Sequence, residues 1–295
     1  MEIINPLINV NPLVTYLDNL RKASITELHK NGKILTFGDC SMLPNIFKQP
    51  RIAAGTYGEI YNTPLKDVVV KKSINPTYNQ TLIEEACMML ILNLPIFPTC
   101  YGIFKCNDGT VFIVMEKING QSYTTWYNQT GKYIDKSELD QIKEFVLLKL
   151  TYFLYLAQSQ YQFTHNDLIG QNIIIYQTEP KYEYFGDFKI WNMGYDIKII
   201  DFGFARLQIP NTNVVFYNKV VRQRYYPNER YVPYIPSADI CKIFSNPNIQ
   251  TTRIKNSNFY REYMTGCNFN PYNYAVIPPF PDMDALTVLE TLYTE

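Results

Sequence analysis

Two short polar segments, each beside a strand-like apolar run, constrain this chain most. The first is residues 165–172 (HNDLIGQN), followed by the apolar residues 173–176. The second is residues 201–203 (DFG), preceded by the β-rich residues 196–200. The two segments place two carboxylates and an amide on short loops. Phosphoryl transfer needs this set, because one carboxylate receives the proton of the attacking hydroxyl while an amide oxygen and the second carboxylate hold Mg²⁺ against phosphates.

In this order, the two segments resemble the catalytic loop and the metal-binding loop of the eukaryotic-type protein kinases. The resemblance implies that Asp167 is the catalytic base and that Asn172 and Asp201 bind the metal ion, Mg²⁺ or alternatively Mn²⁺. The competing interpretation is a pair of polar turns between buried strands. Further kinase motifs upstream, in the family's order, favour the kinase interpretation.

Residues 51–61 (RIAAGTYGEIY) resemble the glycine-rich loop that covers the phosphates of ATP, with Ala53, Gly55, Gly58 and Ile60 at the pattern positions. Glycine suits such a loop because a Cβ would keep backbone amides away from the phosphates. Ala53 replaces the first glycine of the family pattern, so we expect a slightly stiffer loop that still works. In isolation, this segment would predict only a hairpin turn.

Residues 67–72 (DVVVKK) predict a strand that ends in two lysines. The resemblance implies that Lys71 binds the α- and β-phosphates of ATP, and strand alternation then directs Lys72 to the other face. The apolar spacing of residues 80–92 predicts a helix that packs on the sheet. By resemblance, Glu85 on this helix pairs with Lys71, and Glu84 is the alternative partner.

Residues 98–118 predict a β-hairpin, because Asn-Asp-Gly at 107–109 lies between alternating apolar runs. The resemblance implies that Met115 lines the back of the adenine pocket. It also implies that Glu116 to Ile118 form the hinge whose backbone groups bind the edge of adenine.

Downstream, Ser137 predicts the N-cap of a helix whose apolar residues 142–156 form the core of a larger lobe. His165 is expected to pack against Phe202 rather than carry a proton. The aromatic-rich residues 177–195 predict a packed hairpin, with a partner-binding surface as the alternative.

The chain departs from the family after the DFG segment. It lacks Ala-Pro-Glu and has only 92 residues after Gly203 (295 − 203), so we expect an abbreviated large lobe. Residues 209–281 predict irregular connections with short helices. The family's central-helix aspartate is either Asp239 or Asp284. With its abbreviated large lobe, the chain resembles the kinases of large DNA viruses.

Two substitutions fall inside the catalytic loop. Asn166 stands where many kinases carry an Arg that receives an activating phosphate, so we expect constitutive activity or control by a regulatory protein partner. Ile169 stands where Ser/Thr kinases usually carry a Lys near the γ-phosphate, which weakens charge stabilisation. The candidate substitute cations are Arg206, Arg222 and Arg224, and the alternative interpretation of each is a solvated loop residue.

Composition restricts the partners and the compartment. The net charge is zero and basic runs stop at two residues, so nucleic acid is not an expected partner. The N-terminus lacks a signal-peptide pattern and apolar runs stay below 18 residues, so we expect no membrane association. Six cysteines without Cys-x-x-Cys predict free thiols in a reducing compartment, which places the protein in the cytoplasm, or the host cytoplasm if it is viral.

These observations predict an α+β, two-lobed, protein-kinase-like fold. Residues 1–45 form an N-terminal helical extension with a helix near 13–29. Residues 46–118 form the small, ATP-binding lobe, an antiparallel sheet plus one helix, and residues 119–295 form a mainly helical, abbreviated large lobe. The expected function is ATP-dependent phosphorylation of a protein hydroxyl, on Ser or Thr. The alternatives are a pseudokinase that acts as a partner-binding scaffold, and a small-molecule kinase of the aminoglycoside or choline type.

Overall fold

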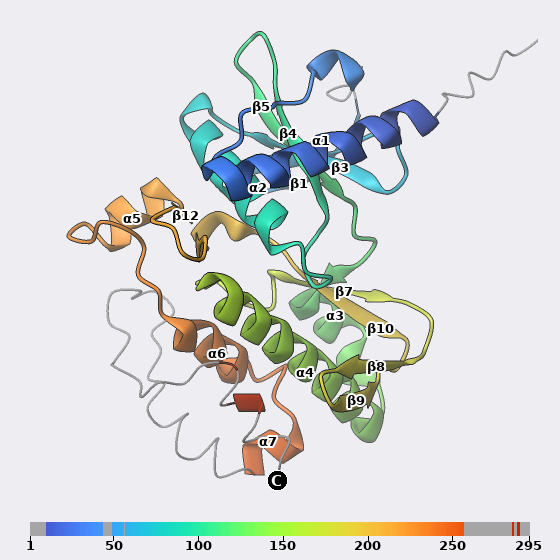
Figure 1. Cartoon of the computed structure of the whole chain (residues 1–295). Helices are drawn as coiled ribbons and strands as arrows, with labels where there is room; N and C mark the ends of the chain where they lie inside the picture. The colour runs from blue at the N-terminus through green and yellow to red at the C-terminus, as the bar shows by residue number, and fades with distance from the viewer. Residues whose placement is uncertain (1–9, 44–48, 56, 257–284, 286–287, 290–295) are drawn as a thin grey trace, which may run out of the picture. The chain divides into compact units, whose positions relative to one another are not determined.

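The structure is a computed structural model that describes residues 10–43, 49–55, 57–256, 285 and 288–289. The chain divides into two compact units (Figure 1). The first comprises residues 1–93 and 98–117, and the second comprises residues 94–97 and 118–295. Each unit has its own sheet and helices, and each is described here by itself.

The first unit contains a five-stranded antiparallel sheet in the order β1-β2-β3-β5-β4. Its centre is β3, where three consecutive valines are buried on both faces. The predicted hairpin between β4 and β5 is confirmed, and Gly109 takes the left-handed conformation in its turn, at a φ of 82°. The strands are β1 (Arg51–Ala54), β2 (Gly58–Asn62), β3 (Val68–Ser73), β4 (Cys100–Lys105) and β5 (Val111–Glu116).

Helix α2 (Asn79–Leu92) is buried along most of its length and packs on β4 and β5, as its apolar spacing predicted. The short helix η3 (Pro76–Tyr78) leads into it. The predicted helix near residues 13–29 is confirmed as α1 (Val10–Asn31), which packs along β4 and α2 (Figure 1). Its Leu20 lies so close to Gly102 that a Cβ at Gly102 would come within 2.6 Å of the leucine Cδ2.

A disulfide bond joins Cys40, in the short helix η1 (Cys40–Met42), to Cys106 in the β4–β5 turn. The prediction of free thiols is therefore wrong for these two cysteines. Their Cα atoms are 5.4 Å apart although 66 positions separate them in the chain. Cysteine spacing could not reveal this pair, because it depends on tertiary packing beside the hairpin. Among the described residues, Cys87, Cys100 and Cys241 are buried and lie outside this disulfide.

The second unit combines small sheets with helices. Strands β10, β7 and β6 form one sheet in that order, β8 pairs with β9, and β11 pairs with β12. The strands are β6 (Gln121–Ser122), β7 (Ile173–Gln177), β8 (Tyr182–Phe185), β9 (Phe188–Trp191), β10 (Tyr195–Ile199), β11 (Arg206–Gln208) and β12 (Val215–Tyr217). The helices are α3 (Tyr123–Gln129), η4 (Gly131–Tyr133), α4 (Lys136–Tyr161), η5 (Phe202–Phe204), α5 (Lys219–Tyr225), α6 (Pro236–Ser245) and α7 (Thr252–Asn256).

Helix α4 forms the centre of the second unit, as predicted, and contacts α6, β8, β9 and β10. Its N-cap is Asp135, so the prediction of Ser137 as the N-cap is wrong. The Asp135 carboxylate accepts a hydrogen bond from the Ser137 backbone N–H at 2.8 Å. Both residue types are good N-caps, so the sequence alone could not separate two candidates two positions apart. Within the described residues, no helix has the length and apolar character needed to cross a membrane.

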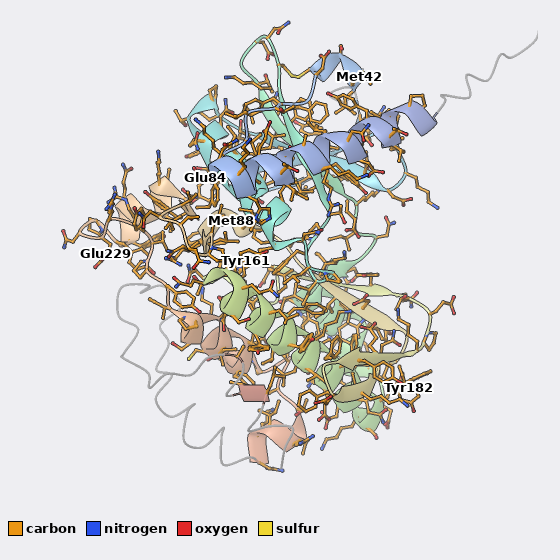
Figure 2. The ribbon with its side chains drawn as sticks, viewed as in Figure 1. Met42, Glu84, Met88, Tyr161, Tyr182 and Glu229 are labelled. Carbon is orange, nitrogen blue, oxygen red and sulfur yellow. A yellow bond between two sulfur atoms is a disulfide. The ribbon has the colours of Figure 1, made fainter. Side chains whose placement is uncertain are left out.

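The aromatic segment at 177–195 folds as the β8–β9 hairpin and packs against α4, so the predicted packed excursion is confirmed. Phe185 is buried beside the rings of Phe145 and Tyr152. Lys149 on α4 forms an ion pair with Glu183 of the hairpin at 2.9 Å. The other face stays exposed and includes Tyr182, which Figure 2 labels.

Candidate active site

The predicted pair between Lys71 and Glu85 is present inside the first unit. The Lys71 side chain ends in a buried ammonium that donates to both Glu85 carboxylate oxygens, at 2.6 and 2.7 Å. Glu84, the alternative partner (labelled in Figure 2), instead accepts a hydrogen bond from Gln80. A buried ion pair of this kind fixes the position of the ammonium more than it stabilises the fold. The contact between β3 and α2 thus sets where Lys71 can act.

The glycine-rich segment forms the β1–β2 hairpin beside Lys71. Ala53 pairs with Ile60, and Ile60 in turn pairs with Lys71 on β3. The Gly55 N–H donates to the Gly58 carbonyl at 2.8 Å, which closes the turn. A Cβ on Gly58 would lie 3.1 Å from the Lys71 side chain, so the lysine passes directly over this glycine. A side chain at position 58 would therefore crowd the lysine.

The three predicted adenine contacts lie at the end of β5. Met115 is buried and pairs with Cys100 across the sheet. The Glu116 carboxylate accepts the Thr99 N–H at 2.9 Å, and the Glu116 N–H donates to the Thr99 carbonyl at 2.8 Å. Ile118 is the first residue of this stretch assigned to the second unit. The role of these residues in binding adenine stays a prediction.

Asp167 and Asn172 lie together in the second unit. The Asn172 amide nitrogen donates to the Asp167 carbonyl at 2.7 Å and to its carboxylate at 2.9 Å. The loop between them is closed by hydrogen bonds through Ile169. This geometry orients the Asp167 carboxylate. Because the amide nitrogen faces Asp167, the amide oxygen of Asn172 is the atom that can bind a metal ion.

Asp201 lies at the neighbouring strand end. The Ile200 N–H donates to the Asn172 carbonyl at 2.9 Å, just beyond the point where β7 and β10 pair. Asp201 is exposed and has a left-handed backbone, with a φ of 63°. Among the described residues, no group of three or more His, Cys, Asp or Glu could hold a metal. Two oxygen ligands fit a cation that takes its remaining ligands from phosphates and water, as Mg²⁺ does in nucleotide sites.

The catalytic loop is anchored by Asp239 on α6. One Asp239 carboxylate oxygen accepts the His165 N–H at 2.7 Å, and the other accepts the Asn166 N–H at 2.8 Å. Burial raises the pKa of Asp239, while His165, Lys242 and these two hydrogen bonds oppose the shift. The structure therefore identifies Asp239 as the central-helix aspartate. Asp284 lies outside the described residues.

His165 has the structural role predicted for it. Its ring lies 5.7 Å from the Phe202 ring, and its Nε2 is 3.0 Å from the Ile200 carbonyl oxygen. The other ring nitrogen, Nδ1, accepts the Asp167 N–H at 3.3 Å. The imidazole therefore connects the backbone of the catalytic loop to the end of β10.

The cation beside Asp167 is Lys242, which was not among the predicted substitutes. Its Nζ lies 3.5 Å from an Asp167 carboxylate oxygen and donates to the Asn166 carbonyl. Burial lowers the pKa of Lys242, and the carboxylates of Asp167 and Asp239 oppose this shift. The available sequence signal was spacing, because Lys242 follows Asp239 by three positions on one helix and therefore shares its face.

The three predicted arginines have other contacts in the described part of the chain. Arg206 donates to the Gln162 carbonyl and to Gln208. Arg222 donates to the Glu229 carbonyl, and Arg224 lies over the Tyr225 ring. Within the described part of the chain none of these contacts involves Asp167, and Arg206 is buried and not the solvated loop residue that the alternative interpretation expected.

The first unit holds a strand lysine braced by a helix glutamate, and the second unit holds an Asp, an Asn and an Asp on loops; these are the residue types that phosphoryl transfer uses. The protein kinase domain family matches residues 48–242, which is well over half of the chain. The chain therefore belongs to the protein kinase domain family and has its two-lobed α+β fold. The match extends beyond residue 206 and includes the part of α6 that holds Asp239 and Lys242.

One relative is a probable serine/threonine-protein kinase of Dictyostelium discoideum. It is 30% identical over 88 residues, which cover 26% of this chain and 7% of the relative. The chain thus spans only a small part of the length of that relative.

Proposed function

We propose that the protein is an ATP-dependent kinase that transfers the γ-phosphoryl group to a serine or threonine hydroxyl of a protein substrate. The observation that carries the proposal is the hydrogen bond from Asn172 to the Asp167 carboxylate at 2.9 Å. It orients the one base that the reaction needs and leaves the amide oxygen of Asn172 to bind a metal ion, on a residue whose backbone carbonyl accepts the N–H of Ile200, the neighbour of Asp201. Phosphoryl transfer uses both an oriented base and an oxygen ligand for the metal ion.

Each residue has one role in this proposal. Asp167 orients the substrate hydroxyl and receives its proton as transfer proceeds. Asn172 and Asp201 would hold the divalent ion, Mg²⁺ or alternatively Mn²⁺, which when bound offsets the negative charge of the phosphates. Lys71 would bind the α- and β-phosphates, in the position that Glu85 gives it. Catalysis of this kind depends on positioning and on charge stabilisation.

The choice of Ser and Thr is supported by the relative, whose name describes a probable serine/threonine-protein kinase. The contacts of Asn166 support activity without an activating phosphate. Its backbone is left-handed, with a φ of 61°, and its side chain donates to the Phe204 carbonyl at 3.2 Å. The position that often carries a phosphate-binding Arg is thus used to join the catalytic loop to the segment after DFG. Control would then come from a regulatory protein partner or be absent.

The test is incubation of the wild type and Asp167→Asn with labelled ATP, Mg²⁺ and a mixed protein pool, followed by phosphoamino-acid analysis. We expect label on serine or threonine with the wild type and a loss of about a hundredfold or more with the variant. Lys71→Ala and Asp201→Ala should lose activity similarly.

Two outcomes would favour the alternatives. Thermal stabilisation by ATP without any transfer would indicate a pseudokinase scaffold. Release of ADP with aminoglycosides or choline, but not with proteins, would indicate a small-molecule kinase. Label on tyrosine alone would contradict the Ser/Thr assignment.

A further inference from the structure

The catalytic loop contains no cation of its own. Residues 165–172 include neither lysine nor arginine, and Ile169, two positions after Asp167, is partly exposed. A carboxylate at this position repels the negative phosphates that must approach it. A phosphoryl-transfer site therefore benefits from a fixed positive charge beside that carboxylate.

Lys242 brings a positive charge to the loop from α6. Its side chain is only 4% exposed, and its Nζ is 3.5 Å from the Asp167 carboxylate. The same nitrogen donates to the Asn166 carbonyl, so it contacts both the backbone and the side chain of the loop. A lysine placed only to neutralise Asp239 would not need these contacts, because Asp239 already accepts two backbone N–H groups.

Two features indicate that Lys242 both orients the Asp167 carboxylate and supplies positive charge beside it. The two oxygens of the Asp167 carboxylate have different partners. One accepts a hydrogen bond from the Asn172 amide, and the other lies beside the Lys242 ammonium. The side chain of Lys242 is buried, whereas that of Asp167 is 20% exposed. The carboxylate can thus meet a substrate hydroxyl while the ammonium stays behind it.

We propose that Lys242 is a positioning residue for phosphoryl transfer, which holds the Asp167 carboxylate and supplies from α6 the positive charge that the catalytic loop lacks. This inference rests on the proposed kinase function. Lys242 acts through Asp167 and does not itself touch the substrate. Its removal should therefore reduce kcat and leave the affinity for ATP largely intact.

The chain offers a matched control in Lys149. This lysine is also buried, on α4, with a side chain 5% exposed, and it pairs with Glu183 and Asp196. Lys149→Met and Lys242→Met thus remove the same ammonium from similar surroundings in the same unit. Of the two changes, only Lys242→Met lies beside the catalytic loop.

The experiment measures kcat, KM for ATP and thermal unfolding for the wild type, Lys242→Met, Lys242→Arg and Lys149→Met. We expect Lys242→Met to lower kcat by about tenfold or more, with KM for ATP changed less than about twofold. Lys242→Arg should keep most of the activity because it keeps the charge. Lys149→Met should stay within about twofold in kcat, although both methionine variants unfold at lower temperature.

A second variant separates charge from packing. Ile169→Lys places a cation on the exposed side of the same loop, and in the Lys242→Met background it should restore about fivefold in kcat. A void left at position 242 could not be repaired from there. If Lys242→Met does not fold, Lys242→Gln makes the same comparison, because it removes the charge and keeps a polar side chain; it should lower kcat by about tenfold or more.

Four results would overturn the inference. Lys242→Met could retain full kcat, or Lys149→Met could lose as much as Lys242→Met, which would show a general effect of stability. Ile169→Lys could fail to raise kcat in the Lys242→Met background, which would show that the loss comes from packing and not from charge. An inactive wild type would refute the kinase function itself, and this inference with it, whereas the first three results leave the kinase function standing.

Discussion

The glycine-rich hairpin and the catalytic loop both match sequence motifs, yet they are held in opposite ways. All four residues of β1 are exposed, and the hairpin is closed by backbone hydrogen bonds. In the catalytic loop, three consecutive backbone N–H groups, from His165 to Asp167, donate to side chains, two of them to the buried Asp239.

The difference shows what each part must do. A loop that follows the phosphates of a nucleotide uses its backbone and needs freedom to adapt, and a side-chain contact of this hairpin, the pair of Arg51 with Glu59, involves the exposed strand β1. A loop that presents one carboxylate must hold it within narrow limits, because small displacements reduce catalysis strongly. The buried charges of α6 provide that restraint. Three predictions test the comparison.

The largest expected effect is at the anchor. Asp239→Ala leaves two buried backbone N–H groups without an acceptor, which should lower the free energy of unfolding of the second unit by about 3–5 kcal/mol. Amide hydrogen exchange at residues 165–167 should accelerate, and phosphate transfer should fall by about a hundredfold. Asp187→Ala, at an exposed position, is the control. Unchanged exchange at these amides would contradict the anchoring role.

An intermediate effect is expected where the hairpin meets Lys71. A Cβ on Gly58 would lie 3.0 Å from the Lys72 carbonyl oxygen and 3.1 Å from Lys71. Gly58→Ala should therefore destabilise the nucleotide-free first unit by about 1–3 kcal/mol. Gly55→Ala is the matched control, since the nearest atom there is 3.8 Å away, and it should stay within about 0.5 kcal/mol in thermal unfolding. Equal effects of the two changes would show that contact with the lysine is unimportant.

The smallest effect is expected at Ala53. Its side chain is exposed on β1, so Ala53→Gly removes little packing and loosens the strand. The cost should be about 0.5–1 kcal/mol in unfolding, with less than about a twofold change in KM for ATP. A much larger change in KM, measured in steady-state assays, would mean that the hairpin is as rigidly specified as the catalytic loop.

Local patterns in the sequence predicted much of the fold. The valines of β3, the Asn-Asp-Gly turn and the apolar spacing of α2 each depend on near neighbours, and all three elements formed as expected. The pair of Lys71 with Glu85 was predicted from the resemblance to the protein kinases, which also left Glu84 open, and the structure contains it.

The rest depended on contacts between distant parts of the chain. Lys242 lies 76 positions from Asn166, and Asp239 lies 74 positions from His165, so the topology of the second unit decides which residues meet. A lysine in the middle of a helix gives no sign by itself that it faces a catalytic loop. The aspartate choice stayed open for the same reason, since Asp239 and Asp284 both begin helix-like sequence.

The packing of α1 bears on where this kinase domain can be cut. The family match begins at residue 48, but Leu17 and Leu20 belong to the same apolar cluster as Phe104 and Phe112. A shortened protein that starts at the family boundary would uncover these rings and leave Cys106 as a single thiol. Such a fragment should aggregate during purification. A protein expressed for study should therefore include α1 and Cys40 in addition to the residues that match the family.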